Sequence, residues 1–159
     1  KEMKQMLWMK EKLPPTTQRL AAHTCPEVND MIRSRTLETL SRMEDAGEPE
    51  LTARIEALNK EWDMDRCTEA KAALCILGCS LLGASKSKFW SLMSMVSAGF
   101  LLHYALFGWC PSAPIMRKMG IRTAEEISLE KYVLKAFRRD FSNVKPIDAA
   151  KLLTAAEKQ

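Results

Sequence analysis

Apolar residues recur at helical spacing along most of the chain. One stripe consists of Val28, Ile32, Leu37, Leu40 and Met43, a second of Leu51, Ile55, Leu58 and Trp62, and a third of Ile127, Leu134, Phe137 and Phe141. Steps of three and four residues place each set on one face of a helix, with charged residues on the other faces. No stretch shows an alternating strand pattern or a repeat. The sequence therefore predicts an all-α fold.

Capping residues, prolines and glycines mark where these helices begin and end. Thr24 is followed by a proline in the first turn and by Glu27, which predicts a helix start, and Gly47 predicts the end of that helix. The next helix is predicted from Pro49. Nothing before Gly78 breaks it, so it is expected to run on into the apolar segment that follows.

The remaining elements lie nearer the ends of the chain. Thr123 and Glu126 form a second capping box, and the helix that they begin is expected to end at Pro146. Short helices are also predicted over residues 1–12 and 147–158. By these boundaries the chain divides into four consecutive segments. These are an N-terminal helix and linker (1–23), a charged helical region (24–71), an apolar hairpin (72–114) and an amphipathic C-terminal region (115–159).

The segment 72–114 has the pattern of a transmembrane helical hairpin. Residues 89–109 are uncharged, and Trp90 and Trp109 lie near the two ends like residues that anchor a helix at a membrane interface. Residues 72–85 are also apolar but would span only ~21 Å, against ~30 Å of hydrocarbon. A three-residue connection makes the two helices antiparallel neighbours. Their small residues, which permit close approach, are Gly78, Ser80, Gly83, Ser91, Ser94, Ser97, Ala98 and Gly99.

The distribution of charge supports a membrane location more than the averages do. The 159 residues carry a net charge of +4, with a mean hydropathy of −0.21, but 72–114 holds only two lysines and no acidic residue. The basic residues are spread among acids without interleaved aromatics, so we predict no nucleic-acid partner. The cluster Arg117, Lys118 and Arg122 is predicted to attract anionic lipid head groups.

The same basic residues predict an orientation in the membrane. Arg66, Lys71, Arg117, Lys118 and Arg122 flank the two outer ends of the hairpin, whereas Lys86 and Lys88 lie in its connection. Because loops rich in lysine and arginine stay on the cytoplasmic side, both termini are predicted to be cytoplasmic.

Two residues at the end of the apolar segment are candidates for chemistry. Cys110 lies at a helix end close to basic residues, so it is either a reactive thiol or a small packing residue. His103 is ionisable inside an apolar span and is either a metal, haem or proton-carrying group or a structural residue. We favour the structural role, with a hydrogen bond to the opposite helix through Ser80 or a backbone carbonyl. Cys110 and His103 are ~10 Å apart along the helix and cannot form a dyad.

The other candidate groups are incomplete. Cys75 and Cys79 share a helix face, but no second pair of ligands accompanies them, so we predict no metal and no cofactor. The five cysteines have no spacing typical of a disulfide framework. Trp62 and Arg66, just before the apolar segment, are either a solvated collar or a site that recognises a partner protein. No complete catalytic set is present, and we predict no enzymatic activity.

Several blocks resemble the bacterial YgaP-like inner-membrane domain family, in particular its stand-alone members. The resemblance rests on Glu61-Trp62-Asp63, Arg66, Gly99-Phe100-Leu101-Leu102-His103, Gly108-Trp109-Cys110-Pro111, Arg117, Gly120, Arg122-Thr123, Glu126-Ile127, Glu130, Tyr132, Leu134-Lys135 and Phe137-Arg138. It implies a two-helix hairpin in the inner membrane that often self-associates, with no established activity. The family's namesake adds a rhodanese domain that carries sulfur on a cysteine. Residues 1–71 lack that domain's pattern, so rhodanese activity is not implied here.

Together these observations predict a small bacterial inner-membrane hairpin protein without catalytic activity. It is expected to act as a homo-oligomer or as an accessory subunit of a membrane complex, with lipids and membrane proteins as partners. The residues predicted to have structural or partner-binding roles are His103, Trp109, Pro111, Trp62 and Arg66. One alternative is a sulfur-relay protein whose acceptor thiol is Cys110, held at the interface by Pro111 and stabilised by Arg117 or Lys118. A second alternative is a soluble all-α obligate dimer.

Overall fold

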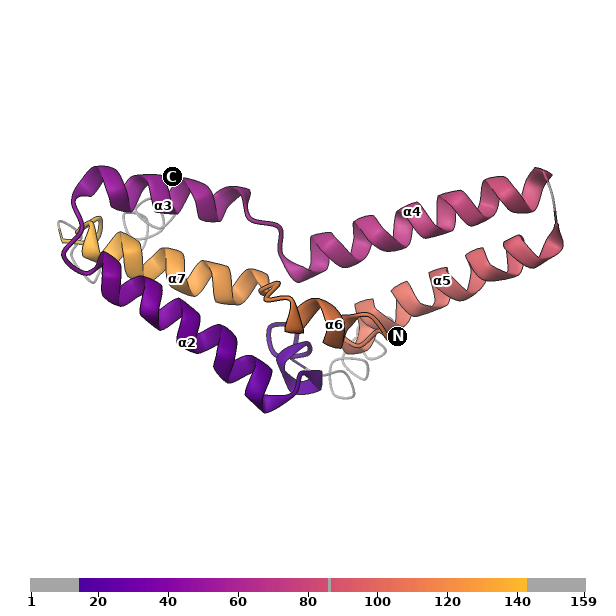
Figure 1. The fold of residues 1–159 in the computed structure, drawn as a ribbon, viewed down its shortest axis with the longest axis horizontal. Helices are drawn as coiled ribbons and strands as arrows, with labels where there is room; N and C mark the ends of the chain where they lie inside the picture. The colour runs from indigo at the N-terminus through magenta and orange to yellow at the C-terminus, as the bar shows by residue number, and fades with distance from the viewer. Residues whose placement is uncertain (1–14, 86, 143–159) are drawn as a thin grey trace, which may run out of the picture. The chain divides into compact units, whose positions relative to one another are not determined.

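The computed structural model describes residues 15–85 and 87–142, and this part of the chain contains helices and no strands, which confirms the predicted all-α fold (Figure 1). The elements are η1 (Ala21–His23), α2 (Pro26–Met43), α3 (Glu48–Lys60), α4 (Met64–Ser85), α5 (Lys88–Phe107), α6 (Ala113–Lys118) and α7 (Ala124–Phe137). The short helices predicted over 1–12 and 147–158 lie outside the described residues.

The chain folds into two compact units, each built from two separate stretches. Of the described residues, the first unit contains those up to Asn29 and those from Met64 to Ile121, and the second contains Asp30–Asp63 and those from Arg122 to Ser142. The apolar segment thus belongs to one unit. The helices before and after that segment meet in the other unit, so the units cut across the order of segments along the sequence.

Helices α4 and α5 form the predicted antiparallel hairpin in the first unit (Figure 1). Their lengths of 22 and 20 residues correspond to ~33 and ~30 Å. The stretches that contain them, Glu48–Ser85 and Lys88–Phe107, are long and apolar enough to cross a membrane. The first two turns of α4 carry charged residues, so its apolar part is shorter than the helix.

Hydroxyl groups line the contact between α4 and α5, and we call Ser80, Ser94 and Ser97 the hydroxyl seam. The Ser80 and Ser94 hydroxyls are 2.8 Å apart, and Ser94 also donates to the carbonyl of Ile76 at 3.2 Å. Ser97 Oγ lies 3.2 Å from the sulfur of Cys75. Each contact joins one helix to the other, so these small residues hold the hairpin together. Small residues have the same role at contacts between membrane helices.

The glycines of α4 and α5 differ in their surroundings. A Cβ added at Gly83 would lie 2.9 Å from the backbone nitrogen of Ser91, so only glycine permits this approach of the two helices. By contrast, a Cβ at Gly78 or Gly99 would meet nothing within 4 Å. These two glycines therefore face away from the partner helix.

The segment before α2 packs on the end of α5. Gly108 ends α5 in the left-handed conformation, with φ 78°, and its N–H donates to the carbonyl of Tyr104 at 2.8 Å. Arg19 donates to the carbonyl of Ala105 at 2.7 Å and pairs with Asp65 at 3.2 Å. A cation that satisfies carbonyls at a helix C-terminus is favourable. The apolar cluster beneath these contacts consists of Leu20, Met64, Tyr104, Cys110 and Ala113.

The second unit is built on contact between α3 and α7, the helices on either side of the hairpin in the sequence. Its buried cluster consists of Leu51, Ile55, Leu58, Ile127 and Leu134, with Leu40, Met43 and Phe137 packed against it. Most residues of the predicted stripes are therefore core residues. Leu37 and Trp62 are exceptions, with 53% and 51% of their surface exposed.

Two predicted helix boundaries and one predicted cap are wrong, although α2 does begin at Pro26 with this proline in its first turn. The helix from Pro49 does not run into the apolar segment but ends at Lys60, because Glu61 becomes extended (ψ 134°) and binds Arg122 with both carboxylate oxygens, at 2.8 and 2.6 Å. Thr24 does not cap α2, since its hydroxyl donates to the carbonyl of Leu20 at 2.8 Å. Helix α7 ends at Phe137, well before Pro146. By contrast, the capping box of Thr123 and Glu126 is confirmed.

Candidate functional site

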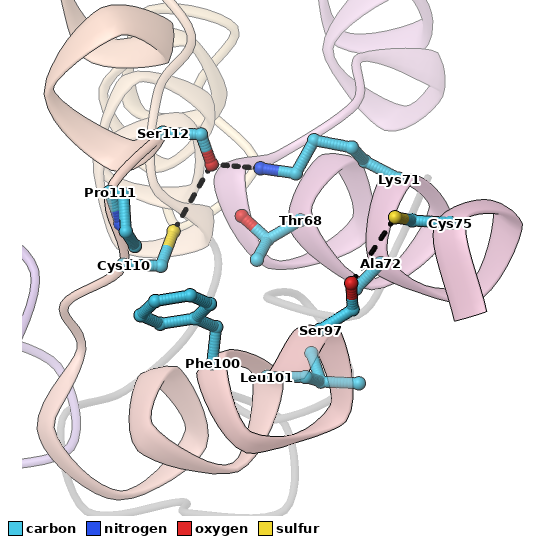
Figure 2. A pocket seen from close by; sticks show the side chains of 10 residues that line it. All are labelled: Thr68, Lys71, Ala72, Cys75, Ser97, Phe100, Leu101, Cys110, Pro111 and Ser112. Atoms are coloured by element: carbon cyan, nitrogen blue, oxygen red, sulfur yellow. Dashed lines mark hydrogen bonds between the residues drawn. The ribbon is translucent and has the colours of Figure 1, made fainter. Parts of the chain in front are cut away.

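A cavity of about 260 Å³ lies between α4 and α5, next to the loop that follows α5 (Figure 2). Its lining residues are Thr68, Lys71, Ala72 and Cys75 of α4, Ser97, Phe100 and Leu101 of α5, and Cys110, Pro111 and Ser112 of the loop. All of them belong to the first unit. Most of the lining is apolar. Lys71, Thr68 and Ser112 lie near the loop, whereas Ser97 lies on the far side next to Cys75 (Figure 2).

A chain of polar contacts crosses the side of the cavity near the loop. The Lys71 ammonium donates to the Ser112 hydroxyl and lies 3.5 Å from the sulfur of Met116. Ser112 Oγ is in turn 3.3 Å from the sulfur of Cys110. Figure 2 shows Lys71, Ser112 and Cys110 in a row, with Thr68 beside them. The arrangement joins a cation, a hydroxyl and a thiol at one edge of an apolar cavity.

Thr68 adds a buried hydroxyl to this edge. The residue is 2% exposed. Its hydroxyl interacts with that of Tyr104, in a contact that falls short of ordinary hydrogen-bond geometry. A group in the cavity that accepted a well-aligned hydrogen bond from Thr68 would therefore compete with Tyr104 for this hydroxyl.

Negative charge is scarce around this edge. The segment 72–114 contains no acidic residue, and among the described residues no carboxylate pairs with Lys71. Asp65, one turn and a half earlier on α4, already binds the Tyr104 hydroxyl at 2.8 Å and Arg19 at 3.2 Å. The charge of Lys71 is therefore available to an anion that enters the cavity.

Several residues named from the sequence line this cavity: Lys71, Cys75, Ser97, Cys110 and Pro111. Cys110 is 5% exposed and belongs to the apolar cluster of the first unit. The cation connected to it through a hydrogen-bond chain is Lys71, reached through Ser112. Whether Cys110 carries sulfur stays a prediction.

The prediction that Arg117 and Arg122 bind lipid head groups is wrong, because the protein buries both. Arg117 is 0% exposed and donates to Asn29 Oδ1 at 2.8 Å and to the carbonyl of Ile121 at 3.1 Å. Arg122 is 8% exposed and pairs with Glu61 and Glu130. Burial disfavours its charge, but these two carboxylates outweigh burial and raise its pKa. Lys118 is exposed and remains a candidate for head-group contact.

His103 has a structural contact, although not with the opposite helix as predicted. Its Nδ1 lies 3.0 Å from the carbonyl oxygen of Trp109, just beyond the end of its own helix. The imidazole also meets the Trp109 ring edge-on, with centroids 5.6 Å apart, and stacks at 4.9 Å from Phe107. Ser80, the suggested partner, binds Ser94 instead. The histidine thus fixes the turn that leads into Cys110.

Trp62 and Arg66 are exposed, on either side of the point where the chain passes from the second unit to the first. A partner-binding role for them stays a prediction. The sequence did not point to Thr68, to Ser112 or to the position of Lys71 in a cavity. Their one visible signal was spacing: residues 68, 71, 72 and 75 follow helical steps on one face of α4. That spacing does not show what lies opposite.

No protein-family model, no curated protein and no solved structure matches this chain. The resemblance to the YgaP-like family consequently stays a prediction.

Proposed function

We propose that this protein is a membrane-anchored helical-hairpin protein of the bacterial inner membrane. In this proposal α4 and α5 cross the bilayer, and the protein acts without catalysis, as a homo-oligomer or an accessory subunit of a membrane complex. The observation that carries the proposal is the exposure of the apolar hairpin, described next.

The apolar side chains of the hairpin are largely exposed. In the most apolar windows of the two candidate spans, 11% and 6% of the residues are buried. Leu74 on α4 and Met95 on α5 have 72% and 71% of their surface exposed, and Leu81 and Leu102 have 64% and 62%. A core helix of a water-soluble protein would bury such residues, whereas a bilayer covers them.

The core of the second unit supports the proposal that the chain crosses the membrane twice. Its core joins α3, which precedes the hairpin, to α7, which follows it. Both helices must therefore lie on the same side of the membrane, and the chain must cross it an even number of times. The basic residues at the outer ends of the hairpin favour the cytoplasm for that side.

Self-association is supported by the outward glycines. Gly78 and Gly99 have open space in place of a side chain, and small residues on lipid-facing helix surfaces permit a second helix to approach closely. The stripes of α3 and α7, by contrast, cover each other within the second unit and do not require a partner.

Alkaline carbonate extraction of membranes tests the proposal. The chain should stay in the pellet, and Met95→Arg, near the middle of α5, should move it toward the supernatant, because a charge in the bilayer centre costs ~2.5–3.5 kcal/mol. The matched control is Leu129→Arg on α7, where the leucine is 58% exposed outside the hairpin; it should leave extraction unchanged. Release of most of the unmodified chain would overturn the membrane location and favour the soluble obligate dimer.

A further inference from the structure

We propose that the cavity between α4 and α5 binds the anionic head of a single-chain amphiphile, such as a long-chain fatty acid. The head would lie against Lys71, Thr68 and Ser112, and the first part of the alkyl chain against Phe100 and Leu101. This inference goes beyond the anchoring role, and it rests on that role only in that a bilayer supplies amphiphiles to the cavity.

The sign of the ligand's charge follows from Lys71. Its ammonium contacts a hydroxyl and a thioether, both of them neutral, and no carboxylate pairs with it among the described residues. An ammonium has three donors, so it binds an incoming carboxylate or phosphate while it keeps the contact with Ser112. Charge-assisted hydrogen bonds of this kind are stronger than neutral ones.

The second observation is the hydroxyl of Thr68, a residue that is 2% exposed and whose only described partner is the Tyr104 hydroxyl, in a poorly aligned contact. In the view of Figure 2 it lies on the same side of the cavity as Ser112 and Cys110. An oxygen of the head group would accept from it. The hydroxyls of Thr68 and Ser112 and the ammonium of Lys71 then offer three donors to one anion.

The shape of the cavity selects the rest of the ligand. Its volume of about 260 Å³ is slightly below the ~300–1,000 Å³ of pockets that enclose drug-sized ligands. It therefore takes a head and the beginning of one chain, and the remainder of the chain would run along the exposed apolar surface of the hairpin. Phe100, 43% exposed, lies at this transition.

Photo-crosslinking tests the proposal with the full chain in phosphatidylcholine nanodiscs. The probe is a diazirine-bearing palmitic acid, and mass spectrometry locates the label. We expect label on the peptides that contain Phe100 and Cys75. Excess palmitic acid should suppress the labelling. Excess hexadecyl phosphate should also suppress it if any anionic head suffices, but not if the site requires a carboxylate. Hexadecanol, which has the same chain without the charge, should not suppress it.

Variants assign the binding to named groups. Lys71→Gln should weaken labelling by about tenfold or more, as expected for the loss of a charge-assisted contact. Thr68→Val keeps the shape and should weaken it less, and Ala72→Phe should block it by filling the cavity. The matched control is Lys88→Gln at the opposite end of the hairpin, which should bind like the unmodified chain.

Equal labelling of Lys71→Gln and the unmodified chain would overturn the proposal, as would equal competition by hexadecanol and palmitic acid. Labelling is repeated in detergent micelles, where it does not depend on membrane insertion. A chain that stays in the carbonate pellet but takes no label refutes the ligand and keeps the anchor. A chain that carbonate extracts from the membrane but that is labelled in micelles refutes the anchor and keeps the ligand.

Discussion

At the scale of single residues, the second unit contains a buried charge that the spacing of apolar residues in the sequence does not predict. Glu130 is 1% exposed, and its carboxylate accepts hydrogen bonds from Arg54, at 2.9 and 2.7 Å, and from Arg122. The sequence shows only a charged residue on a helix. Its burial depends on two arginines, one of them 76 residues away, so no local pattern reveals it.

Removal of Arg122 is expected to destabilise the second unit. Arg122→Ala leaves Glu61 without its bidentate partner and buried Glu130 with Arg54 alone, and breaking a buried pair costs ~3–5 kcal/mol. Urea unfolding of the micelle-solubilised chain, followed by circular dichroism, measures the loss. The control is Arg42→Ala, whose pair with Glu38 is about 70% exposed and contributes ~0.5 kcal/mol or less. Similar unfolding midpoints for both variants would contradict the structural role of this ion-pair network.

Cys25 gives a prediction that depends on pH. Its thiol donates to the Glu27 carboxylate at 2.6 Å, and this hydrogen bond raises the pKa of Cys25 and lowers that of Glu27. Glu27→Gln removes the carboxylate, so more thiolate should be present at a given pH and the alkylation profile of Cys25 should move to lower pH. Peptide mass spectrometry after timed alkylation measures the profile. Asp30→Asn, a nearby loss of charge, should leave it in place. An unchanged profile in Glu27→Gln would show that the contact is absent in solution.

At the scale of elements, the sequence predicted those features of the helices that are set by residues close together in the chain. The hairpin, its short connection, the start of α7 and most of the core stripe residues follow from spacing and capping chemistry. One of the failures has a long-range cause, whereas the Thr24 hydroxyl fails as a cap because it binds the carbonyl of Leu20, four residues earlier. Helix α3 stops at Lys60 because Glu61 binds Arg122, 61 residues later. The carboxylates and guanidiniums that end or fix helices are ordinary surface residues until the fold brings them together.

The contact between α4 and α5 is tested by two glycines of the same helix. Gly83→Ala places a Cβ against the Ser91 backbone and should destabilise the hairpin by ~1–3 kcal/mol. Gly78→Ala meets open space, and the better helix propensity of alanine should make it neutral or stabilising by up to ~1 kcal/mol. SDS titration in mixed micelles, followed by tryptophan emission, compares the two. Equal effects would mean that the helices are not in close contact at Gly83.

At the scale of the whole molecule, the sequence predicted the pairing of the two hairpin helices but not the pairing of the helices that flank them. The pairing of α3 with α7 and the cavity between α4 and α5 both join residues far apart in the chain. In the sequence, Lys71 was visible only as a basic residue at the start of the apolar segment. The neighbours that give it a role, Ser112 and Thr68, carry no pattern of their own.

The two-unit organisation predicts a membrane topology. In a chain whose native cysteines are replaced, Ser34→Cys and Ser142→Cys should react with a membrane-impermeant maleimide from the same side, since both flank the second unit's core. Ser87→Cys, in the connection of the hairpin, should react from the opposite side. Labelling of intact and permeabilised cells distinguishes the sides, and the charge distribution predicts that the pair is cytoplasmic. Reaction of Ser34→Cys and Ser142→Cys from opposite sides would exclude a double crossing.

If α4 and α5 cross the bilayer as proposed, the hydroxyl seam constrains how the hairpin is inserted during synthesis. If one helix left the translocon alone, it would carry its serines into hydrocarbon without their partners on the other helix. The apolar part of α4 is also short for a bilayer. When α4 and α5 arrive together, Ser80 and Ser94 are already bonded to each other. We therefore expect α4 to wait at the translocon until α5 emerges, so that the two helices partition into lipid as a pair.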